Sequence, residues 1–171
     1  MIHIYSGDGK GKTTAAVGMA VRAAGAGLRV LFCQFLKDGS SSEIGVLRSI
    51  PGIEVRCCTE CRKFVFRMND DERAAVTASH NAMLCGVRDI ISSHAADVVI
   101  LDEFCGAYST GLIDRTAAES IVRECPESVE LVLTGRDPAP VFCGIADYHS
   151  EITPIKHHYS KGVKARRGIE Y

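Results

Sequence analysis

A glycine-rich stretch near the amino terminus has the residue types and spacing that bind phosphate groups. It runs from Ser6 to Thr14 with the sequence SGDGKGKTT and follows the apolar run of residues 1–5. Glycines let several backbone N–H groups point at one anion, and a helix that begins near Lys12 adds the positive end of its dipole. Lys12 supplies a mobile positive charge, and the Thr13 hydroxyl suits Mg²⁺. We therefore expect a phosphate-binding loop formed by Gly7, Asp8, Gly9, Lys10, Gly11, Lys12, Thr13 and Thr14.

The loop departs at one position from the strict phosphate-loop pattern GxxxxGK[ST]. Ser6 stands where that pattern has its first glycine. The alternative interpretation is a glycine-rich turn with incidental lysines. A strand before the loop, a helix after it and the Gly-Lys-Thr core favour phosphate binding.

An acidic pair, Asp102 and Glu103, ends the apolar run VVILDE of residues 98–103. In phosphate-loop proteins an acid at this point holds Mg²⁺ directly or through water, and hard oxygen ligands suit that ion. The alternative is a solvated strand end. With Thr13, the pair predicts a site for a magnesium-bound nucleotide.

The elements that must position these residues alternate along the chain. Apolar segments that suit buried strands are followed by segments with helical spacing or helix-favouring residues. Strands are expected at 1–5, 28–35, 53–56, 97–103, 129–133 and 148–154, and helices at 12–26, 69–94, 114–125 and 140–145. This order predicts a single-domain α/β protein of the P-loop NTPase type, with a mostly parallel sheet covered by helices on both faces. Ligands bind such sheets at the carboxyl ends of the strands, which brings the loop and the acidic pair into one crevice.

Length and charge narrow the possible partners. The chain has 171 residues, which favours one domain over 1–171, and a formal net charge of −1, which does not indicate a nucleic-acid partner. Its apolar runs are far shorter than the ~20 residues that cross a membrane. The first residues do not resemble a secretory signal, so we expect a cytoplasmic protein. The segment 155–171 forms a basic carboxyl-terminal tail.

Eight cysteines are many for this length. In a reduced cytoplasm we expect them to act mostly as small apolar core residues. That role suits the cysteines in or beside apolar segments, namely Cys33, Cys85, Cys105, Cys125 and Cys143. The cluster of Cys57, Cys58 and Cys61 has CxxC spacing, yet no second CxxC or HxxxH pair follows to complete a metal site. We favour an ordinary loop there over metal or redox chemistry.

These residues leave the reaction open. Kinases, motor ATPases, GTPases and other transferases share the phosphate loop. A GTPase would need a guanine-binding NKxD element, and the sequence contains none. From the residues alone, the chain is a P-loop nucleotide enzyme.

Several blocks of the sequence together resemble the P-loop ATP:corrinoid adenosyltransferases, the family that makes the Co–C bond of coenzyme B12. The loop and the tail together make the resemblance specific, whereas the VVILDE run alone is weak, and serine at position 6 is usual in this family. The matching blocks are the loop with Ala15, Ala16, Gly18 and Arg22, then residues 98–103, residues 131–136, residues 155–157 and residues 162–171.

The resemblance implies a reaction other than phosphoryl transfer. A corrinoid reduced to Co(I) attacks C5′ of the ATP ribose, and the whole triphosphate leaves. In the family, ATP lies reversed in the loop relative to ordinary P-loop NTPases. Co(I) is already a strong nucleophile and needs no general base, so catalysis consists of positioning and of stabilising the departing polyanion.

By matching motifs, the resemblance assigns roles to individual residues. The loop would bind the triphosphate, with Lys12, Thr13 and Glu103 as the catalytic set. Thr13 and Glu103 would hold Mg²⁺, with Asp102 supporting them. The family carries an aromatic-x-Trp pair ahead of the long helix, which packs against the corrinoid, displaces the lower axial ligand and eases cobalt reduction. Here Phe64 and Phe66 stand at those positions, and the chain has no Trp; the alternative is that both rings only anchor a loop.

The family also implies partners: ATP, a corrinoid, a reduced flavoprotein as electron donor and a second copy in a homodimer. Longer members carry a segment before the first strand that can cover the site. This sequence begins at the strand, so we expect closure to depend more on the basic tail or on a partner subunit. Two other functions remain as alternatives: a generic P-loop kinase or ATPase, and a non-catalytic nucleotide- or corrinoid-binding module.

Overall fold

The centre of the molecule is a six-stranded sheet, seen in a computed structural model that describes residues 1–157 and 162–169. Its strands are β1 (Ile2–Ser6), β2 (Val30–Gln34), β3 (Ile53–Cys57), β4 (Val98–Asp102), β5 (Glu130–Thr134) and β6 (Tyr148–Glu151). They lie in the order β3-β2-β4-β5-β1-β6, and every neighbouring pair is parallel. All strands therefore present their carboxyl ends at one edge of the sheet.

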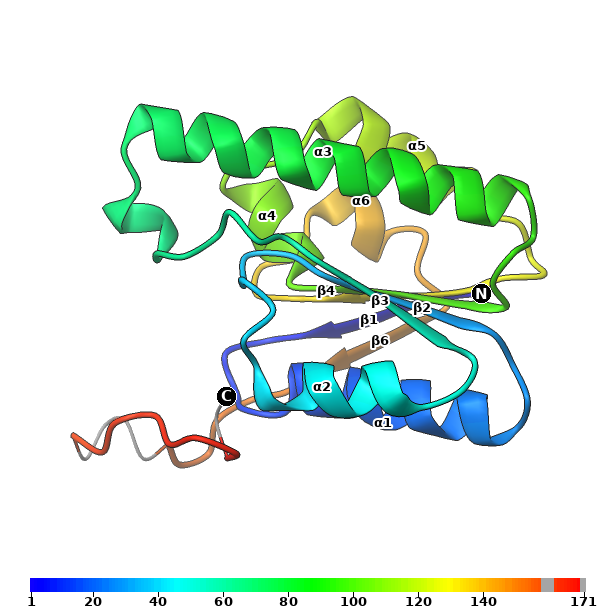
Figure 1. Ribbon diagram of the computed structural model, residues 1–171, viewed down its shortest axis with the longest axis horizontal. Coiled ribbons are helices and arrows are strands. Elements are labelled where there is room, and N and C mark those ends of the chain that lie inside the picture. Colours follow the sequence, from blue (N-terminus) through cyan, green and yellow to red (C-terminus); the bar gives the residue numbers. More distant parts are fainter. Residues whose placement is uncertain (158–161, 170–171) are drawn as a thin grey trace.

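Helices cover both faces of this sheet (Figure 1). The helices α1 and α2 lie on one face, and α3, α4, α5 and α6 lie on the other. Their bounds are α1 (Lys12–Gly25), α2 (Ser42–Ser49), α3 (Asp70–Ser92), α4 (Phe104–Ser109), α5 (Arg115–Arg123) and α6 (Pro140–Cys143), and a short 3₁₀ turn, η1 (Val65–Arg67), precedes α3. None of the helices in the described part of the chain is long and apolar enough to cross a membrane.

Alternating side chains of the central strands fill two apolar cores. In β2, Leu31 and Cys33 join the core on the α3 side, whereas Phe32 joins the core beneath α1 and α2. Burial on both faces explains why β2 and β4 are continuous apolar runs rather than alternating ones. The predicted α/β fold with a parallel sheet is confirmed.

Side-chain caps fix the start of two helices on the larger layer. Asn69 accepts a hydrogen bond from the backbone N–H of Glu72, whose carboxylate accepts one in return from the Asn69 backbone, which forms a capping box at α3. Asp114 accepts from the backbone N–H of Ala117 at the start of α5. Such caps each contribute about 1 kcal/mol.

Two helices next to the acidic pair and the phosphate loop were not expected from the sequence. The helix α2 begins at Ser42, where only a turn-rich loop was expected, and α4 begins directly after Glu103. Both are too short for a clear helical repeat. Burial of Ile44 in one and Phe104 in the other holds them against the sheet. The last strand is also shorter than expected, since β6 ends at Glu151.

The cysteines expected in the core do not behave alike. Cys33 and Cys105 are buried, and Cys125 and Cys143 are half-buried. The expectation was wrong for Cys85, which is exposed because it lies on the solvent side of α3. Sequence context alone did not distinguish the two sides of that helix.

The CxxC cluster is more buried than an ordinary surface loop. Cys58 and Cys61 form a small apolar core with Val76 of α3 and Leu112. Burial raises the pKa of the Cys61 thiol to about 11, so this sulfur stays protonated and poorly nucleophilic at neutral pH. Within residues 1–157 and 162–169, no three His, Cys, Asp or Glu side chains are grouped to hold a metal ion.

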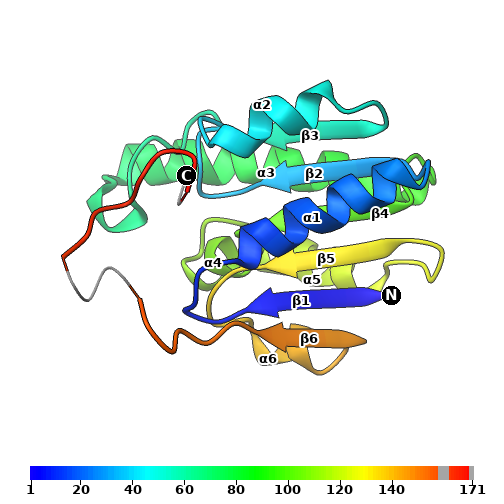
Figure 2. The ribbon, with the colours of Figure 1, turned by 90° about the horizontal axis from the view of Figure 1, so that it is seen from below.

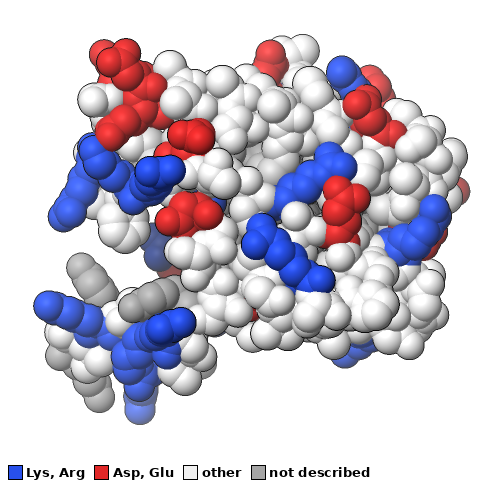
Figure 3. Space-filling model, in the orientation of Figure 1, with Lys and Arg blue, Asp and Glu red and all other residues white. Residues whose placement is uncertain are grey.

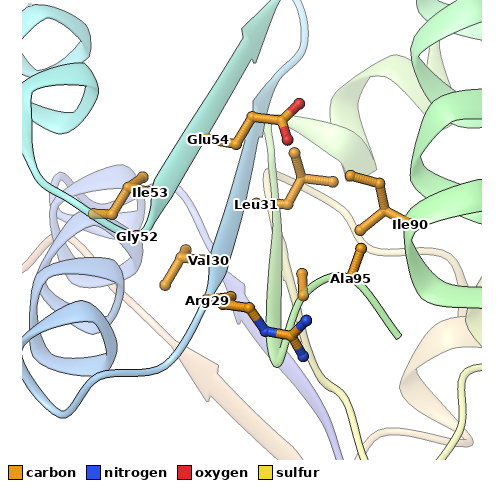
Figure 4. Close-up of a pocket in the computed structure, with 9 residues that line it drawn as sticks. Arg29, Val30, Leu31, Gly52, Ile53, Glu54, Ile90 and Ala95 are labelled. Atoms are coloured by element: carbon orange, nitrogen blue, oxygen red, sulfur yellow. The ribbon is translucent and has the colours of Figure 1, made fainter. Parts of the chain in front are cut away.

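A small cavity of about 290 Å³ lies at the amino ends of β2, β3 and β4. Figure 4 shows Leu31 and Ile90 facing each other across it from the sheet and from α3. At its rim, the Arg29 guanidinium donates two hydrogen bonds to the Asp97 carboxylate, at 2.8 and 3.1 Å. The cavity is thus at the opposite end of the sheet from the phosphate loop.

Candidate functional site

The phosphate loop joins β1 to α1 at the carboxyl edge of the sheet. The Lys12 side chain, which is buried, donates hydrogen bonds to the carbonyl oxygens of Gly7 at 2.6 Å and Gly9 at 2.9 Å. Burial lowers the pKa of the Lys12 amine, and the Glu103 carboxylate is the largest influence in the opposite direction. The loop therefore holds a positive charge at the start of α1, where the N–H groups of the first turn also point outward.

The end of β6 packs directly against the phosphate loop. The backbone N–H of Gly9 donates to the Ile152 carbonyl at 2.7 Å, and the Ile152 N–H donates to the Ser6 carbonyl at 2.8 Å. A Cβ atom on Gly9 would lie 2.5 Å from that Ile152 oxygen, so only glycine fits here. Ser6, which replaces the first glycine of the strict pattern, has its hydroxyl 2.8 Å from His149 Nε2 of β6. The departure from the pattern thus serves to tie β1 to β6.

Asp102, at the end of β4, is fully buried beneath the loop. Its Oδ1 accepts hydrogen bonds from the hydroxyls of Thr13 at 2.8 Å and Thr134 at 2.7 Å. Its Oδ2 accepts from the Gln34 amide at 3.1 Å and lies 3.4 Å from the Lys37 ammonium. The contact between Thr13 and Asp102 shows that the loop and the acidic pair, far apart in sequence, form one site.

Glu103 follows Asp102 with a left-handed backbone conformation, at φ 58° and ψ 17°. Its N–H donates to the Thr134 hydroxyl at 2.9 Å, which holds this strained residue at the start of α4. Burial, followed by the neighbouring Asp102 carboxylate, raises the pKa of Glu103. The positive charges of Lys37 and Lys12 oppose that shift. Glu103 is therefore a buried carboxyl group whose ionisation is opposed by burial and by Asp102 and favoured by two nearby lysines.

A cavity of about 700 Å³ opens above these residues. Most of the expected loop residues line it, together with Glu103, whereas Gly7 and Asp102 lie outside its lining. The lining also includes Val17, Lys37, Ser42 and Glu43, which the sequence did not single out. It further includes Arg136, His157, Gly168 and Ile169, which belong to the blocks that match the family but had no assigned role. At its edge, Arg136 pairs with Asp8 at 3.3 Å. The cavity therefore carries positive charge from several separate segments.

Comparison with known proteins identifies the family. The sequence profile of the family described as ATP:corrinoid adenosyltransferase BtuR/CobO/CobP matches residues 1–171. The chain belongs to this family. Corrinoid adenosyltransferases of Escherichia coli (strain K12) and Salmonella typhimurium are 30% and 31% identical to it over 171 residues, which is 100% of the chain and 85% of each relative. The Pseudomonas aeruginosa corrinoid adenosyltransferase is 30% identical over 169 residues, which is 98% of the chain and 82% of that relative.

One solved structure gives only a weak likeness. The Aeropyrum pernix ORC2 protein in its ADPNP–ADP complexes overlaps 89% of the chain and 41% of its own length, with 17% identity and a TM-score of 0.46. The assignment to the ATP:corrinoid adenosyltransferases therefore rests on the sequence match and makes the chain a transferase that uses ATP and a corrinoid.

The aromatic pair expected to contact the corrinoid lies apart from the phosphate cavity. Phe64 and Phe66 follow β3, with the rings stacked at a centroid distance of 5.6 Å. They are 70% and 80% exposed, which is unusual for two large apolar side chains side by side. Arg67 lies over the Phe66 ring at 5.6 Å. The pair therefore forms an exposed apolar surface at the carboxyl side of the sheet, outside the cavity.

The described parts of the tail lie at the carboxyl edge of the sheet, with the part after β6 at one side and residues 162–169 toward β2 (Figure 2). Figure 3 shows Lys and Arg side chains gathered on it. The exposed basic residues there include Lys164, Arg166 and Arg167, while His157 and Ile169 reach the cavity lining. Residues 158–161 and 170–171 of the expected tail lie outside the described residues.

The sequence assigned no role to the residues that surround Asp102 from neighbouring strands. Gln34, Lys37 and Thr134 follow or end β2 and β5, the two strands that flank β4. Their positions at strand ends were a usable signal, because parallel strands bring such residues together. Their individual roles depend on strand order, which the sequence did not provide.

Proposed function

We propose that the chain transfers the 5′-deoxyadenosyl group of ATP to the cobalt of a Co(I) corrinoid and releases inorganic triphosphate. The observation that carries this proposal is the family match over residues 1–171 combined with an intact phosphate loop, in which Lys12 is held by the loop carbonyls. The reaction would supply adenosylcobalamin or a precursor of it.

The proposed step balances without a protein base. The cobalt electron pair forms the Co–C bond to C5′, the bond from C5′ to the phosphate oxygen breaks, and its electron pair leaves with the triphosphate. The residues of the loop then act on the leaving group: Lys12 and the first-turn amides of α1 stabilise its growing negative charge. Arg136 and Lys37 line the same cavity and add to the positive potential around the triphosphate.

The oxygen atoms below the loop suit Mg²⁺. Thr13 Oγ1, the Glu103 carboxylate and the buried Asp102 carboxylate are the hard ligands that this ion prefers. We propose that Thr13 and Glu103 hold the ion and that Asp102 orients Thr13. A bound Mg²⁺ would supply further positive charge for the phosphates.

We propose that the corrinoid contacts the exposed rings of Phe64 and Phe66. The stacked pair offers apolar area and no atom that ligates cobalt, which suits the axial face of a corrinoid that has lost its lower ligand. We further propose a cytoplasmic homodimer that receives electrons from a reduced flavoprotein. The tail, with His157 and Ile169 at the cavity, would help to cover the bound ATP.

One reaction mixture distinguishes the proposed activity from its alternatives. The protein is incubated anaerobically with ATP, Mg²⁺ and chemically reduced corrinoid, and the phosphorus products are identified by ³¹P NMR. Stoichiometric triphosphate with a light-sensitive alkylcobalt spectrum supports adenosyl transfer. ADP and phosphate would instead indicate a kinase or ATPase, and binding of ATP without any product would indicate a non-catalytic module.

A further inference from the structure

The Asp102 carboxylate carries a full set of hydrogen-bond donors, of which one is charged. A carboxylate has about four lone-pair sites. Thr13 and Thr134 occupy two of these at Oδ1, and Gln34 occupies one at Oδ2. The fourth contact is the Lys37 ammonium, at 3.4 Å from Oδ2. Lys37 thus places a positive charge in direct contact with a fully buried acid.

The Lys37 ammonium also touches the loop residue that is proposed to hold Mg²⁺. Its Nζ lies 3.5 Å from Thr13 Oγ1 and 3.4 Å from Asp102 Oδ2, so it lies beside the hydrogen-bonded pair of Thr13 and Asp102. Burial opposes its charge, but Asp102 above all, with Glu103 and Glu43, raises the pKa of Lys37. The side chain is 32% exposed and lines the nucleotide cavity, so it can leave this position without unfolding the site.

The backbone that carries Lys37 is fixed from the core. The preceding residue, Leu36, has a left-handed backbone with φ 53°, which is strained for a branched side chain. The Leu36 N–H donates to His80 Nε2 at 3.3 Å, and the other ring nitrogen of His80 faces the Leu112 carbonyl at 2.9 Å. Because a carbonyl only accepts, His80 is the neutral tautomer with its proton on Nδ1. The turn that aims Lys37 at Asp102 is therefore held by a buried hydrogen-bond chain.

A second observation marks the same spot as suited to a hydrated cation. Gln34 is fully buried and donates its amide to Asp102 and to Glu43, while its Oε1 has no hydrogen-bond partner within the described residues. Leaving a buried acceptor without a partner destabilises the folded state, so such atoms are rare unless another group satisfies them. Water bound to a divalent cation is a donor that could do so beside Asp102.

We propose that Lys37 is a built-in counter-cation of Asp102, which contacts both Thr13 and Asp102 and which a divalent cation must displace in order to bind. The inference rests on the proposed nucleotide site but not on adenosyl transfer. It makes Lys37 a positioning residue that governs metal affinity, in contrast to Lys12, whose ammonium is held by loop carbonyls.

Titration with Mn²⁺ tests the proposal without corrinoid or nucleotide. Free Mn²⁺ is followed by electron paramagnetic resonance for the wild type, Lys37→Met, Lys37→Gln and Lys37→Arg. Both neutral variants should bind Mn²⁺ about tenfold more tightly or better, because no charged hydrogen bond has to be broken first. Lys37→Arg should resemble the wild type. Far-ultraviolet circular dichroism confirms that the variants are folded.

Two control variants test whether the gain in Mn²⁺ affinity arises from the contact between Lys37 and Asp102. Lys63→Met removes an exposed lysine that pairs with Glu72 away from the cavity, and it should leave Mn²⁺ binding unchanged. Adding Asp102→Asn to Lys37→Met should abolish the gain, because the acid itself is then lost. If the neutral variants bind Mn²⁺ no better than the wild type, or show no binding at all, the proposal is wrong. A wild-type protein that fails to form triphosphate but shows the predicted Mn²⁺ effect would overturn the adenosyl-transfer proposal alone.

Discussion

The two ends of the sheet each carry an ion pair in a different setting. At the carboxyl end, the fully buried Asp102 pairs with Lys37, whereas at the amino end Asp97 lies at the surface and pairs with Arg29. The first pair lies beneath a cavity of about 700 Å³, and the second rims a cavity of about 290 Å³. The backbone does not separate the two ends, since left-handed residues occur at both: Leu36 and Glu103 at the carboxyl end, and His94 just before β4 at the amino end.

This difference distinguishes a proposed ligand site, around Asp102 and Lys37, from a structural ion pair, that of Arg29 and Asp97. Burying a carboxylate together with most of an ammonium group removes their hydration, so the carboxyl end lowers stability unless its groups serve a ligand. The Arg29–Asp97 pair keeps its water and forms two hydrogen bonds with good geometry. The hydrogen-bonded guanidinium of Arg29 lowers the pKa of Asp97 to about 2, so this acid stays charged under any ordinary condition. Removing a charged side chain should therefore lower activity at the carboxyl end of the sheet and leave it unchanged at the amino end.

The largest effect is expected from Lys12→Ala. The substitution removes a charge-assisted contact to the triphosphate worth about 1.5–3 kcal/mol, which lowers kcat/KM for ATP by about ten- to a hundredfold. Steady-state adenosylation at limiting ATP measures it, with Arg29→Met as the matched control at the other end of the sheet. Near-wild-type kcat/KM in Lys12→Ala would break the assignment of the carboxyl end as the site.

The exposed rings of Phe64 and Phe66 allow a second test at the carboxyl end, apart from the phosphate loop. Phe64→Ala and Phe66→Ala should slow the reaction strongly when cobalt starts as Co(II), because a five-coordinate cobalt is harder to reduce. They should slow it much less when a strong reductant supplies Co(I), and ATP binding should hardly change. Electron paramagnetic resonance of the Co(II) corrinoid with protein and ATP reports the four-coordinate species.

The control for the ring substitutions is Tyr148→Ala. It removes a half-exposed ring of β6 that stacks on His3 of β1. It should leave both reactions unaltered. Equal losses with Co(II) and Co(I), together with a normal four-coordinate signal in both Phe variants, would show that the pair only anchors the loop.

A smaller effect concerns His80, which supports the Lys37 turn. Burial lowers the pKa of His80, so the folded state binds its proton less readily than the unfolded state does. Below the unfolded pKa of about 6.5, the free energy of unfolding should fall as the pH falls, by at most about 1.4 kcal/mol per pH unit for one proton. His80→Gln has no titratable ring and should lack that part of the slope.

Urea denaturation of the wild type and His80→Gln between about pH 8 and about pH 5 measures the His80 contribution. The two curves of unfolding free energy against pH should diverge in slope on the acidic side. Parallel curves would mean that folding does not lower the pKa of His80, and the hydrogen-bond chain to Leu36 would then be wrongly assigned.

The smallest effect is expected at the amino end. Arg29→Met should leave kcat/KM for ATP within about twofold of the wild type, since exposed ion pairs contribute little. Because the pKa of Asp97 is lowered, the pair stabilises the fold above pH ~4, and this contribution is lost as the pH falls toward 2. The unfolding curves of the wild type and the variant should therefore converge at low pH. A clear loss of adenosylation would show that the two ends are coupled.

The sequence by itself determined the parts of this protein that depend on local pattern. Apolar runs and helical repeats predicted the α/β fold, and the glycine-rich stretch with its Gly-Lys-Thr core predicted the turn that joins β1 to α1, because turn geometry and strand burial restrict residue type. The VVILDE run placed Asp102 at a strand end. The resemblance of the loop and the tail to one family led to the same family that the full-length match shows.

Only the tertiary structure determined which side chains come into contact at the candidate site. The order β3-β2-β4-β5-β1-β6 places β4 between β2 and β5, and so brings Gln34, Lys37 and Thr134 around Asp102. It also sets β6 beside β1, which explains Ser6 by its contact with His149. Strand order depends on packing between segments far apart in the chain, and no local pattern encodes it.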